Sequence, residues 1–359
     1  MKIYTLKDFQ LGSLFFIAVL SFLSTNSFAQ NTDDQSITII GVGDMMLGTN
    51  YPSASYLPAN GGKDLLSDVE SILKDADLTF GNLEGTLLDK GGTVKRCKNP
   101  SVCYAFRSPE SYVNHFVNAG FDVLSMANNH TRDFGESGRN RTKEVLKSKG
   151  IFYAGLAGTD EFSIFTIGGV KYGFCAFAPN VGTVDVRNIT KAKQIVAKLE
   201  SQCDIVIVSF HGGAEGAKNQ RVTKKTEYYY GENRGNVHSF AHGVIDAGAD
   251  IVFGHGPHVT RAAELYKDRF IIYSLGNFCT YGRFNLRDVA GYAPIIKLHV
   301  DKNGAFKSGE VVPIYQQKTH GPKVDPQKRA IKKLRELTNL DFPNSGLKFY
   351  DDGRIEKTN

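Results

Sequence analysis

The sequence predicts an α/β fold, built as one continuous domain with strands enough for two sheets flanked by helices. Over most of the chain, apolar runs typical of strands alternate with amphipathic segments typical of helices. The last third instead contains short strand-like runs separated by turns, as in antiparallel sheet. The 359 residues are 41% hydrophobic and 22% charged, which supplies enough apolar material for a large core. No repeat or Pro- and Gly-rich linker divides the chain, so one domain is favoured over two.

The first half of the chain has the alternation that builds parallel sheet. We expect strands at 36–43, 77–83 and 121–127, and helices at 64–76, 110–120 and 137–150. Gly150 ends the third of these helices, as glycine commonly does. The run 162–178 then predicts a hairpin that turns at Gly168 and Gly169.

The second half begins in the same way and then changes character. Expected helices at 190–201 and 235–248 are each followed by an expected strand, at 204–210 and 249–254. Four short strands follow, at 261–266, 269–275, 293–300 and 308–315. We therefore expect the main domain to span 36–316, with a C-terminal helical extension over 317–359 that packs on it.

The N-terminus has the pattern of a secretory signal over residues 1–29. Lys2 and Lys7 precede the apolar run "LGSLFFIAVLSFL", and Ser27 and Ala29 offer small residues at the spacing that signal peptidase reads. The run is shorter than the ~18 residues needed to cross a bilayer. An uncleaved anchor remains an alternative, because the run can be extended through "STNS", but no Cys marks a lipoprotein site. The pattern predicts export to the periplasm or the cell surface.

The charge is mildly basic and scattered. Loss of residues 1–29 would change the net charge from +6 to +5. Only "KKTEYYY" and "QKRAIKKLRE" are locally basic, so the sequence does not predict a nucleic-acid partner, although the balance would not repel a polyanionic substrate.

Five cysteines in an exported chain are candidates for disulfides. Cys97 and Cys103 flank the turn-prone "KNPSV", and we expect them to form a bridge. Cys175 and Cys203 lie in or beside apolar runs, which favours buried free thiols, and Cys279 is left unassigned. None of the cysteines has the spacing of a zinc site.

Polar side chains follow five of the expected strands at the point where each strand ends. Because the carboxyl ends of strands in an open α/β sheet form the edge where ligands bind, these side chains should converge on one crevice. They are Asp44, Glu84, the group Asn128, Asn129 and His130, then His211, and finally His255 with His258.

The chemistry of these groups is that of a metal site. Carboxylates, an amide oxygen and imidazoles are donors that divalent Mn, Zn, Fe or Mg accept, and a carboxylate between two ions is a common bridge in dinuclear centres. The sequence therefore predicts one or two divalent metal ions as cofactor.

Each of these residues also has an ordinary structural explanation. Asp44 alone would most often be a turn residue or a helix cap. His211 lies beside glycines that allow close approach, and "GHGPH" places two imidazoles in one loop, which a structural turn rarely does. Three histidines fall within expected helices, where packing or surface exposure is the expected role, and two lie in late segments without a partner; they are His115, His238 and His242, then His299 and His320. The coincidence of five strand ends therefore carries the prediction.

In these motifs the chain resembles the CapA family of capsule and poly-γ-glutamate synthesis proteins, which is itself similar to calcineurin-like metallophosphoesterases. The motifs are "GVGDMMLG", "GNLEGTL", "FDVLSMANNHTRDFGESG", "VSFHGGAEG", "GADIVFGHGPHV" and "IIYSLGNF", and they extend from about Thr38 to Phe278. The resemblance implies a four-layer α/β/β/α sandwich and a role in making, exporting or releasing an extracellular polymer. It also implies as partners an anionic extracellular polymer or its precursor and membrane-bound capsule-synthesis proteins.

The resemblance further implies site roles. Asp44, Glu84, Asn129, His211 and the histidines of "GHGPH" would be metal ligands, and His130 would protonate the leaving group. Asp133 would orient His130, although a turn-capping role is an equal alternative. Candidate substrate-binding residues are Asn128, Glu215 and Asn277, of which Asn277 also fits a turn before the next strand.

Two departures from the metallophosphoesterase pattern affect the expected chemistry. Met46 stands where those enzymes usually have the histidine of Asp-x-His, and His255 and His258 are three apart where His-x-His is usual. The first departure costs one metal a ligand, and the two together predict that a second ion is weakly bound or absent. In addition, poly-γ-glutamate is linked by amides, so a phosphoester has no obvious place in it. Two functions remain: a metal-dependent hydrolase or transferase acting on an envelope polymer, and a non-catalytic polymer-binding or assembly subunit that retains the pocket.

Overall fold

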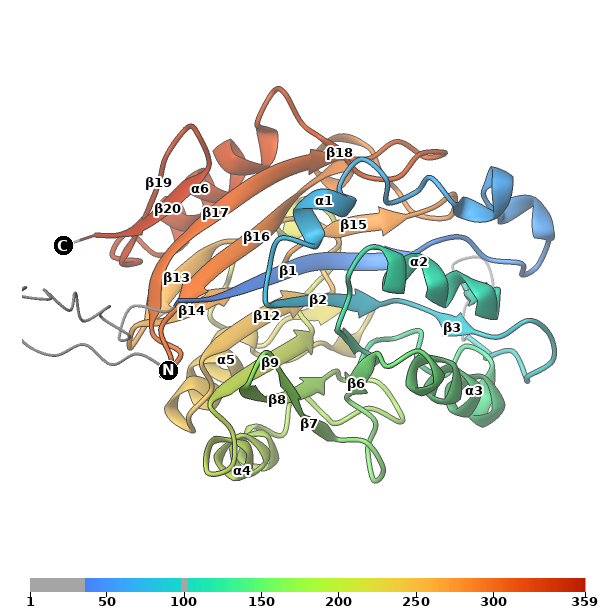
Figure 1. The fold of residues 1–359 in the computed structure, drawn as a ribbon, viewed down its shortest axis with the longest axis horizontal. Helices are drawn as coiled ribbons and strands as arrows, with labels where there is room; N and C mark the ends of the chain where they lie inside the picture. Colours follow the sequence, from blue (N-terminus) through green and yellow to red (C-terminus); the bar gives the residue numbers. More distant parts are fainter. Residues whose placement is uncertain (1–35, 98–102, 359) are drawn as a thin grey trace, which may run out of the picture. The chain divides into compact units, whose positions relative to one another are not determined.

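The computed structural model describes residues 36–97 and 103–358. The expected signal over 1–29, and the residues between Cys97 and Cys103, lie outside the described part. The described residues fold around two mixed β-sheets (Figure 1). Two further pairs of short strands, β3 (Thr86–Leu87) with β4 (Arg107–Ser108) and β10 (Tyr228–Tyr229) with β11 (Glu232–Asn233), stand apart from them.

The larger sheet is parallel in one half and antiparallel in the other. Its strand order is β19-β20-β17-β16-β1-β2-β5-β6. The parallel strands are β1 (Ile37–Met46), β2 (Leu78–Leu83), β5 (Val123–Ser125) and β6 (Phe152–Ala154), and β15 (Asn277–Thr280) also pairs in parallel with β1. The antiparallel strands are β16 (Tyr292–Val300), β17 (Phe306–Tyr315), β18 (Lys323–Val324), β19 (Leu347–Phe349) and β20 (Arg354–Lys357).

The smaller sheet has the order β13-β14-β12-β9-β8-β7. Four central strands run in parallel, namely β14 (Arg269–Ile272), β12 (Ile251–His255), β9 (Ile205–His211) and β8 (Val170–Phe177). Antiparallel β13 (Ala263–Tyr266) and β7 (Phe162–Ile167) form its two edges. The hairpin of β7 and β8 turns at Gly168 and Gly169 as predicted.

The main core lies between the two sheets. Phe80 of β2 stacks on Phe253 of β12, with ring centroids 5.2 Å apart. Gly41 of β1 permits this contact, because a Cβ atom there would lie 2.5 Å from the Phe253 ring. The apolar side chains that face each other across this layer are buried, and such burial is the largest favourable contribution to folding.

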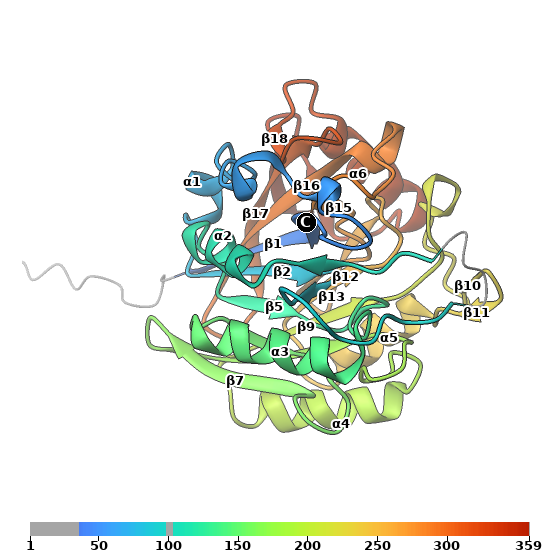
Figure 2. The ribbon, with the colours of Figure 1, turned by 90° about the vertical axis from the view of Figure 1, so that its right-hand side faces the viewer.

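Helices cover the outer faces of both sheets (Figures 1 and 2). On the larger sheet, α1 (Glu70–Leu73), α2 (Val113–Asn118) and α3 (Gly135–Ser148) contribute side chains to a second apolar cluster. On the smaller sheet, α4 (Ile189–Glu200) and α5 (Val237–Asp246) pack in a third. Helix α6 (Arg329–Asp341) packs against β16 and β17. The layers are therefore α/β/β/α, as the resemblance implied.

Two segments differ from the sequence prediction. The expected helix 64–76 is a series of turns that ends in the single helical turn α1. The segment 317–358 contains α6, but it also contributes β18, β19 and β20 to the larger sheet. The C-terminal segment therefore extends the sheet as well as adding a helix.

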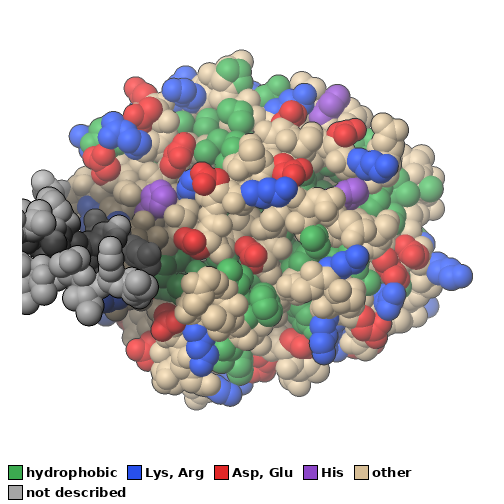
Figure 3. Space-filling view, viewed as in Figure 1, with side chains coloured by type: hydrophobic (Ala, Val, Ile, Leu, Met, Phe, Trp, Pro, Cys, Tyr) green, Lys and Arg blue, Asp and Glu red, His purple; other side chains and the backbone are tan. Residues whose placement is uncertain are grey.

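None of the described helices is long and apolar enough to cross a bilayer. Acidic and basic side chains are interspersed on the face that Figure 3 shows, so this face presents no basic stripe of the kind that binds nucleic acid.

The expected disulfide joins Cys97 and Cys103, and Cys175, Cys203 and Cys279 are free. Because the bridge closes a loop with a sequence separation of only 6, it restrains few unfolded conformations. We expect the double variant Cys97→Ser/Cys103→Ser to lose at most about 3 kcal/mol of unfolding free energy. Urea denaturation of wild type and variant, with Cys203→Ser as control, measures this. A much larger loss would show that the bridge holds more of the fold than its own loop.

Candidate metal centre

The carboxyl ends of strands from both sheets meet at one place. In Figure 1 the arrowheads of β1, β2 and β9 point to the same side of the domain. Asp44 lies near the end of β1, beside irregularities in its register with both neighbouring strands, and such bulges can redirect a side chain. Its Oδ1 lies 3.1 Å from His255 Nδ1, and its Oδ2 lies 2.8 Å from His258 Nδ1. Asp44 therefore joins the larger sheet to the loop that ends β12 in the smaller sheet.

The loops that carry the histidines pack backbone against backbone. His211 and His255 are register partners at the ends of β9 and β12. Gly256 has a φ of +112°, and a Cβ atom there would lie 2.8 Å from the backbone of Gly212. His258 itself has a φ of +57°, a backbone conformation that residues other than glycine rarely adopt. The glycines and the turned backbone together bring His258 back over Asp44.

Several buried polar atoms at this edge have no hydrogen-bond partner within the described residues. They are both carboxylate oxygens of Glu84, both ring nitrogens of His211, His255 Nε2 and Asn129 Oδ1. A buried polar group without a partner is costly, so this concentration marks a candidate ligand site. Carboxylate, imidazole and amide donors fit a divalent transition-metal ion. Ligand atoms of Asp44, Glu84 and His258 all lie within 4.8 Å of one another.

Burial and mutual charge determine the protonation of this cluster. Burial raises the pKa of Glu84 well above its usual value, and the nearby charge of Asp44 adds to this. Burial would also raise the pKa of Asp44, but the hydrogen bonds from His255 and His258 outweigh it and hold that pKa well below the usual range. Burial opposes the charged form of His258, yet the two carboxylates raise its pKa to about 10. The protein alone thus places a protonated imidazole between Asp44 and Glu84, where positive charge is favoured.

His130 lies beside the cluster and is held by two charged groups. Its Nδ1 lies 2.7 Å from Asp133 Oδ2, and Lys95 Nζ lies 2.6 Å from Asp133 Oδ1. Its Nε2 faces the cluster, 3.9 Å from Glu84 Oε1. Burial lowers the pKa of His130 to about 4 despite the opposing effect of Asp133. At neutral pH the ring is therefore neutral in the protein alone.

An aromatic wall, formed by Phe106 and Phe284, closes one side of the centre. Phe106 stacks on His130 with ring centroids 4.3 Å apart, and the rings of Phe284 and His258 are nearly perpendicular, with centroids 5.3 Å apart. Met46 packs with these two rings, and its sulfur accepts a hydrogen bond from the backbone N–H of Gly48. The position that is usually a histidine in metallophosphoesterases is thus part of an apolar surface here.

The three expected substrate-binding residues take different positions. The amide of Asn128 donates to Asn82 and to the carbonyl of Leu83, and its oxygen accepts from the N–H of His130, so this side chain positions its neighbours. Asn277 is the register partner of Asp44 and donates to the carbonyl of His258, while its buried oxygen has no partner among the residues that the structure describes. Glu215 pairs with Arg234, and its charge raises the pKa values of Glu84 and His258.

The sequence prediction did not include several residues of this centre. Asn82 donates to Asp44 at 2.9 Å and links it to Asn128. Lys95 and Phe106 contact Asp133 or His130 from a loop that has no strand or helix pattern. Only Asn82 had a signal, since it lies two residues before Glu84 in the same strand-end motif.

A buried ion pair supports the loop that follows His211. Arg261 is fully buried, and its guanidinium binds Glu227 at 2.8 and 3.0 Å, while Glu227 also accepts from the N–H of Ala214. We expect Glu227→Gln to lower the unfolding free energy by about 3–5 kcal/mol, because it leaves a buried charge uncompensated. Chemical denaturation measures this, with Glu144→Gln in the exposed pair with Arg141 as control. Equal effects of the two substitutions would contradict the supporting role.

The chain is similar to known proteins over most of its length. The family model described as "Bacterial capsule synthesis protein PGA_cap" matches residues 38–281. The chain is 27% identical over 340 residues to the capsule biosynthesis protein CapA of Bacillus anthracis, covering 91% of this chain and 79% of that protein. It is 28% identical over 322 residues to the PGA biosynthesis protein CapA of Bacillus subtilis strain 168, covering 85% and 78%. Among solved structures, a putative 5'-nucleotidase from Staphylococcus aureus is similar at 16% identity and a TM-score of 0.45, covering 84% of this chain and 58% of that one.

Proposed function

Because the chain belongs to the bacterial capsule synthesis protein family PGA_cap, we propose that it is an exported metal-dependent hydrolase or transferase acting on an envelope polymer. The polymer would be of the capsule or poly-γ-glutamate type, as the names of the Bacillus relatives suggest. The disulfide between Cys97 and Cys103 supports export, since such bridges persist in oxidising compartments.

The main support for this proposal is the concentration of buried metal-ligating atoms that have no hydrogen-bond partner among the described residues. Glu84, His211, His255 and Asn129 each keep at least one buried polar atom without a partner in the described part of the chain. A purely structural crevice would pair such atoms with one another or with backbone groups. With Asp44 and His258 they would form the ligand set for one divalent ion, or for two.

A bound divalent ion would polarise the scissile bond and supply a water of lowered pKa at neutral pH. Asn82 holds Asp44 in place from the neighbouring strand. Asn128 fixes the backbone of His130 relative to Asn82. The aromatic wall would keep water away from one side of the centre, which would strengthen the electrostatic interactions there.

His130 would be the proton-transfer group of this centre. Asp133 and Lys95 fix its ring from the Nδ1 side, which leaves Nε2 directed toward the cluster. Since the ring is neutral in the protein alone, Nε2 accepts a proton more readily than it donates one. An anionic substrate beside Nε2 would raise the pKa of His130 and so favour donation of a proton to a leaving group.

One observation favours the second candidate function, a polymer-binding or assembly subunit without catalysis. Met46 adds an apolar side chain to the wall where a further ligand would complete a dinuclear centre. A single ion with a reduced ligand set could serve to bind an anionic polymer without cleaving it.

Turnover separates the two functions. Purified protein, loaded with manganese or zinc, is incubated with γ-linked glutamate oligomers and with a generic phosphodiester. The enzyme proposal expects metal-dependent cleavage of one of them, and removal of the ion with a chelator should abolish it. Polymer binding without cleavage of either substrate by the loaded protein would favour the assembly function instead.

A further inference from the structure

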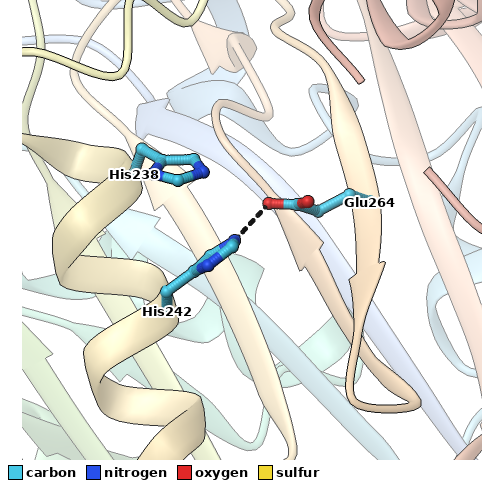
Figure 4. A group of neighbouring side chains, drawn as sticks. All are labelled: His238, His242 and Glu264. Carbon is cyan, nitrogen blue, oxygen red and sulfur yellow. Dashed lines mark hydrogen bonds and ion pairs between the residues drawn. The ribbon is translucent and has the colours of Figure 1, made fainter. Parts of the chain in front are cut away.

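A second group of metal-ligating side chains lies on the outer face of the smaller sheet, outside the centre described above. His238 and His242 are one helical turn apart on α5, and Glu264 lies on edge strand β13. Figure 4 shows both imidazoles projecting from the same side of the helix toward the carboxylate. One ligand atom from each residue lies within 4.8 Å of the other two.

From this cluster we infer that the protein binds a second divalent transition-metal ion through His238, His242 and Glu264. We expect this ion to be zinc and its role to be structural. Two imidazoles and a carboxylate are a ligand set that zinc accepts, with a further position left for water. Zinc ligands lie about 2.0–2.2 Å from the ion, so that two of them are about 3.4 Å apart. The three ligand atoms lie within 4.8 Å of one another, so binding would require side-chain rotations to reach this spacing.

The present contacts prepare the three side chains for an ion. His242 Nε2 lies 2.8 Å from Glu264 Oε1, and the hydroxyl of Tyr273 donates to the same oxygen at 2.6 Å. The hydroxyl of Tyr273 would continue to orient the carboxylate of Glu264, as groups behind metal ligands commonly do. Within the described residues His238 has ring contacts but no hydrogen bond, so its nitrogens remain available.

Packing holds the two imidazoles in place. His238 stacks parallel to Tyr273 and Phe342, and His242 stacks on Tyr266 with centroids 3.8 Å apart. These contacts already restrict the rotamers of the two histidines, so less conformational entropy is lost when an ion binds. The side chain of His242 is 24% exposed, which leaves a route for the ion from solvent. The ion would tie α5 to the edge strand β13, and we expect it to raise the thermal stability of the protein.

The cluster could instead be only a stacked, hydrogen-bonded contact, and two substitutions separate these explanations. His238→Phe keeps an aromatic ring against Tyr273 and Phe342 but removes the ligand nitrogens. Glu264→Gln keeps the shape of the side chain but removes its charge. Each variant should bind one zinc ion fewer per chain than wild type after chelation and titration with zinc chloride, and should lose the zinc-dependent rise in Tm. The exposed residue His320 supplies the control, His320→Ala, which should match wild type. Equal zinc binding by all four proteins would overturn the inference.

A measurement on the wild-type protein keeps the test independent of variant folding. Diethylpyrocarbonate modifies accessible imidazoles, and peptide mass spectrometry identifies the modified sites. Zinc should slow the modification of His238 and His242 at least several-fold and leave that of His320 unchanged. Equal rates at all three histidines with and without zinc would contradict the site.

Discussion

Asp44→Asn should remove the metal of the main centre and abolish turnover. Asp44 is fully buried, and its two oxygens already hold His255 and His258 in place. The asparagine keeps the shape of the side chain and an acceptor for Asn82, but it removes the negative charge that a cation needs. Loss of a group behind a metal ligand typically costs 10–100-fold in affinity, so loss of a ligand charge should cost at least about that much. Elemental analysis and the cleavage assay measure both effects.

The matched control is Asp75→Asn. Asp75 is a surface carboxylate, 76% exposed, in an ion pair with Lys297. This substitution should leave the metal content and turnover at wild-type values, because exposed pairs contribute little. A folded Asp44→Asn protein with wild-type metal content would contradict the ligand role of Asp44.

The variant His130→Ala should retain the bound metal but lose most of its catalytic turnover. His130 binds Asp133 through Nδ1, and its Nε2 lies near Glu84 without occupying a position that holds Asp44 or His258. If it transfers a proton at Nε2, its removal should lower turnover by about 10²- to 10⁴-fold, as is typical for loss of general acid–base catalysis. Metal content and the urea midpoint should change little by comparison.

His115→Ala serves as the control for this substitution, because His115 lies on α2 and contacts the carbonyl of Gly61. In a deletion strain that makes a capsule or related polymer, His115→Ala should restore polymer output, whereas His130→Ala should not. Full restoration by His130→Ala would eliminate catalysis at this residue and would favour the polymer-binding function.

The sequence alone predicted the long central strands and the convergence of their ends. Strand patterns were clear because the central parallel strands β2, β9 and β12 are buried on both faces, which produces continuous apolar runs such as "DIVIVSF". Polar residues directly after such runs are conspicuous, so Asp44, Glu84, His211 and His255 could be identified from local pattern alone. Their shared location followed from the rule that the ends of parallel strands meet at one edge.

The predicted helix over 64–76 was wrong, because its buried residues have helical spacing although most of the segment is not helical. In 64–76 the apolar residues Leu65, Leu66, Val69 and Leu73 are all buried at helical spacing, yet only Glu70–Leu73 is helical. Periodicity reports which side chains face the core, and a chain of turns can present the same side chains. The strands β19 and β20 were missed because each is very short, although Gly353 with φ +103° marks the turn between them.

Residues that act through tertiary contacts could not be predicted. Lys95 and Phe106 approach His130 from loops whose sequence has no periodic pattern. The pair His238 and His242 did have a signal, the four-residue spacing on a helix, but its partner Glu264 lies on a different strand far along the chain. Such pairings depend on how the layers pack, which local patterns do not contain.

The most direct test of the metal centre is an anomalous-difference map from crystals of wild-type protein that was purified without a chelator. We predict a peak at a metal absorption edge within about 2.0–2.3 Å of Asp44 and a nitrogen of His211 or His258. Glu84, whose buried oxygens lack partners in the described chain, should also reach the peak or a water bound to it. A well-ordered map without any peak at this edge of the sheets, from protein saturated with manganese or zinc, would contradict the metal centre.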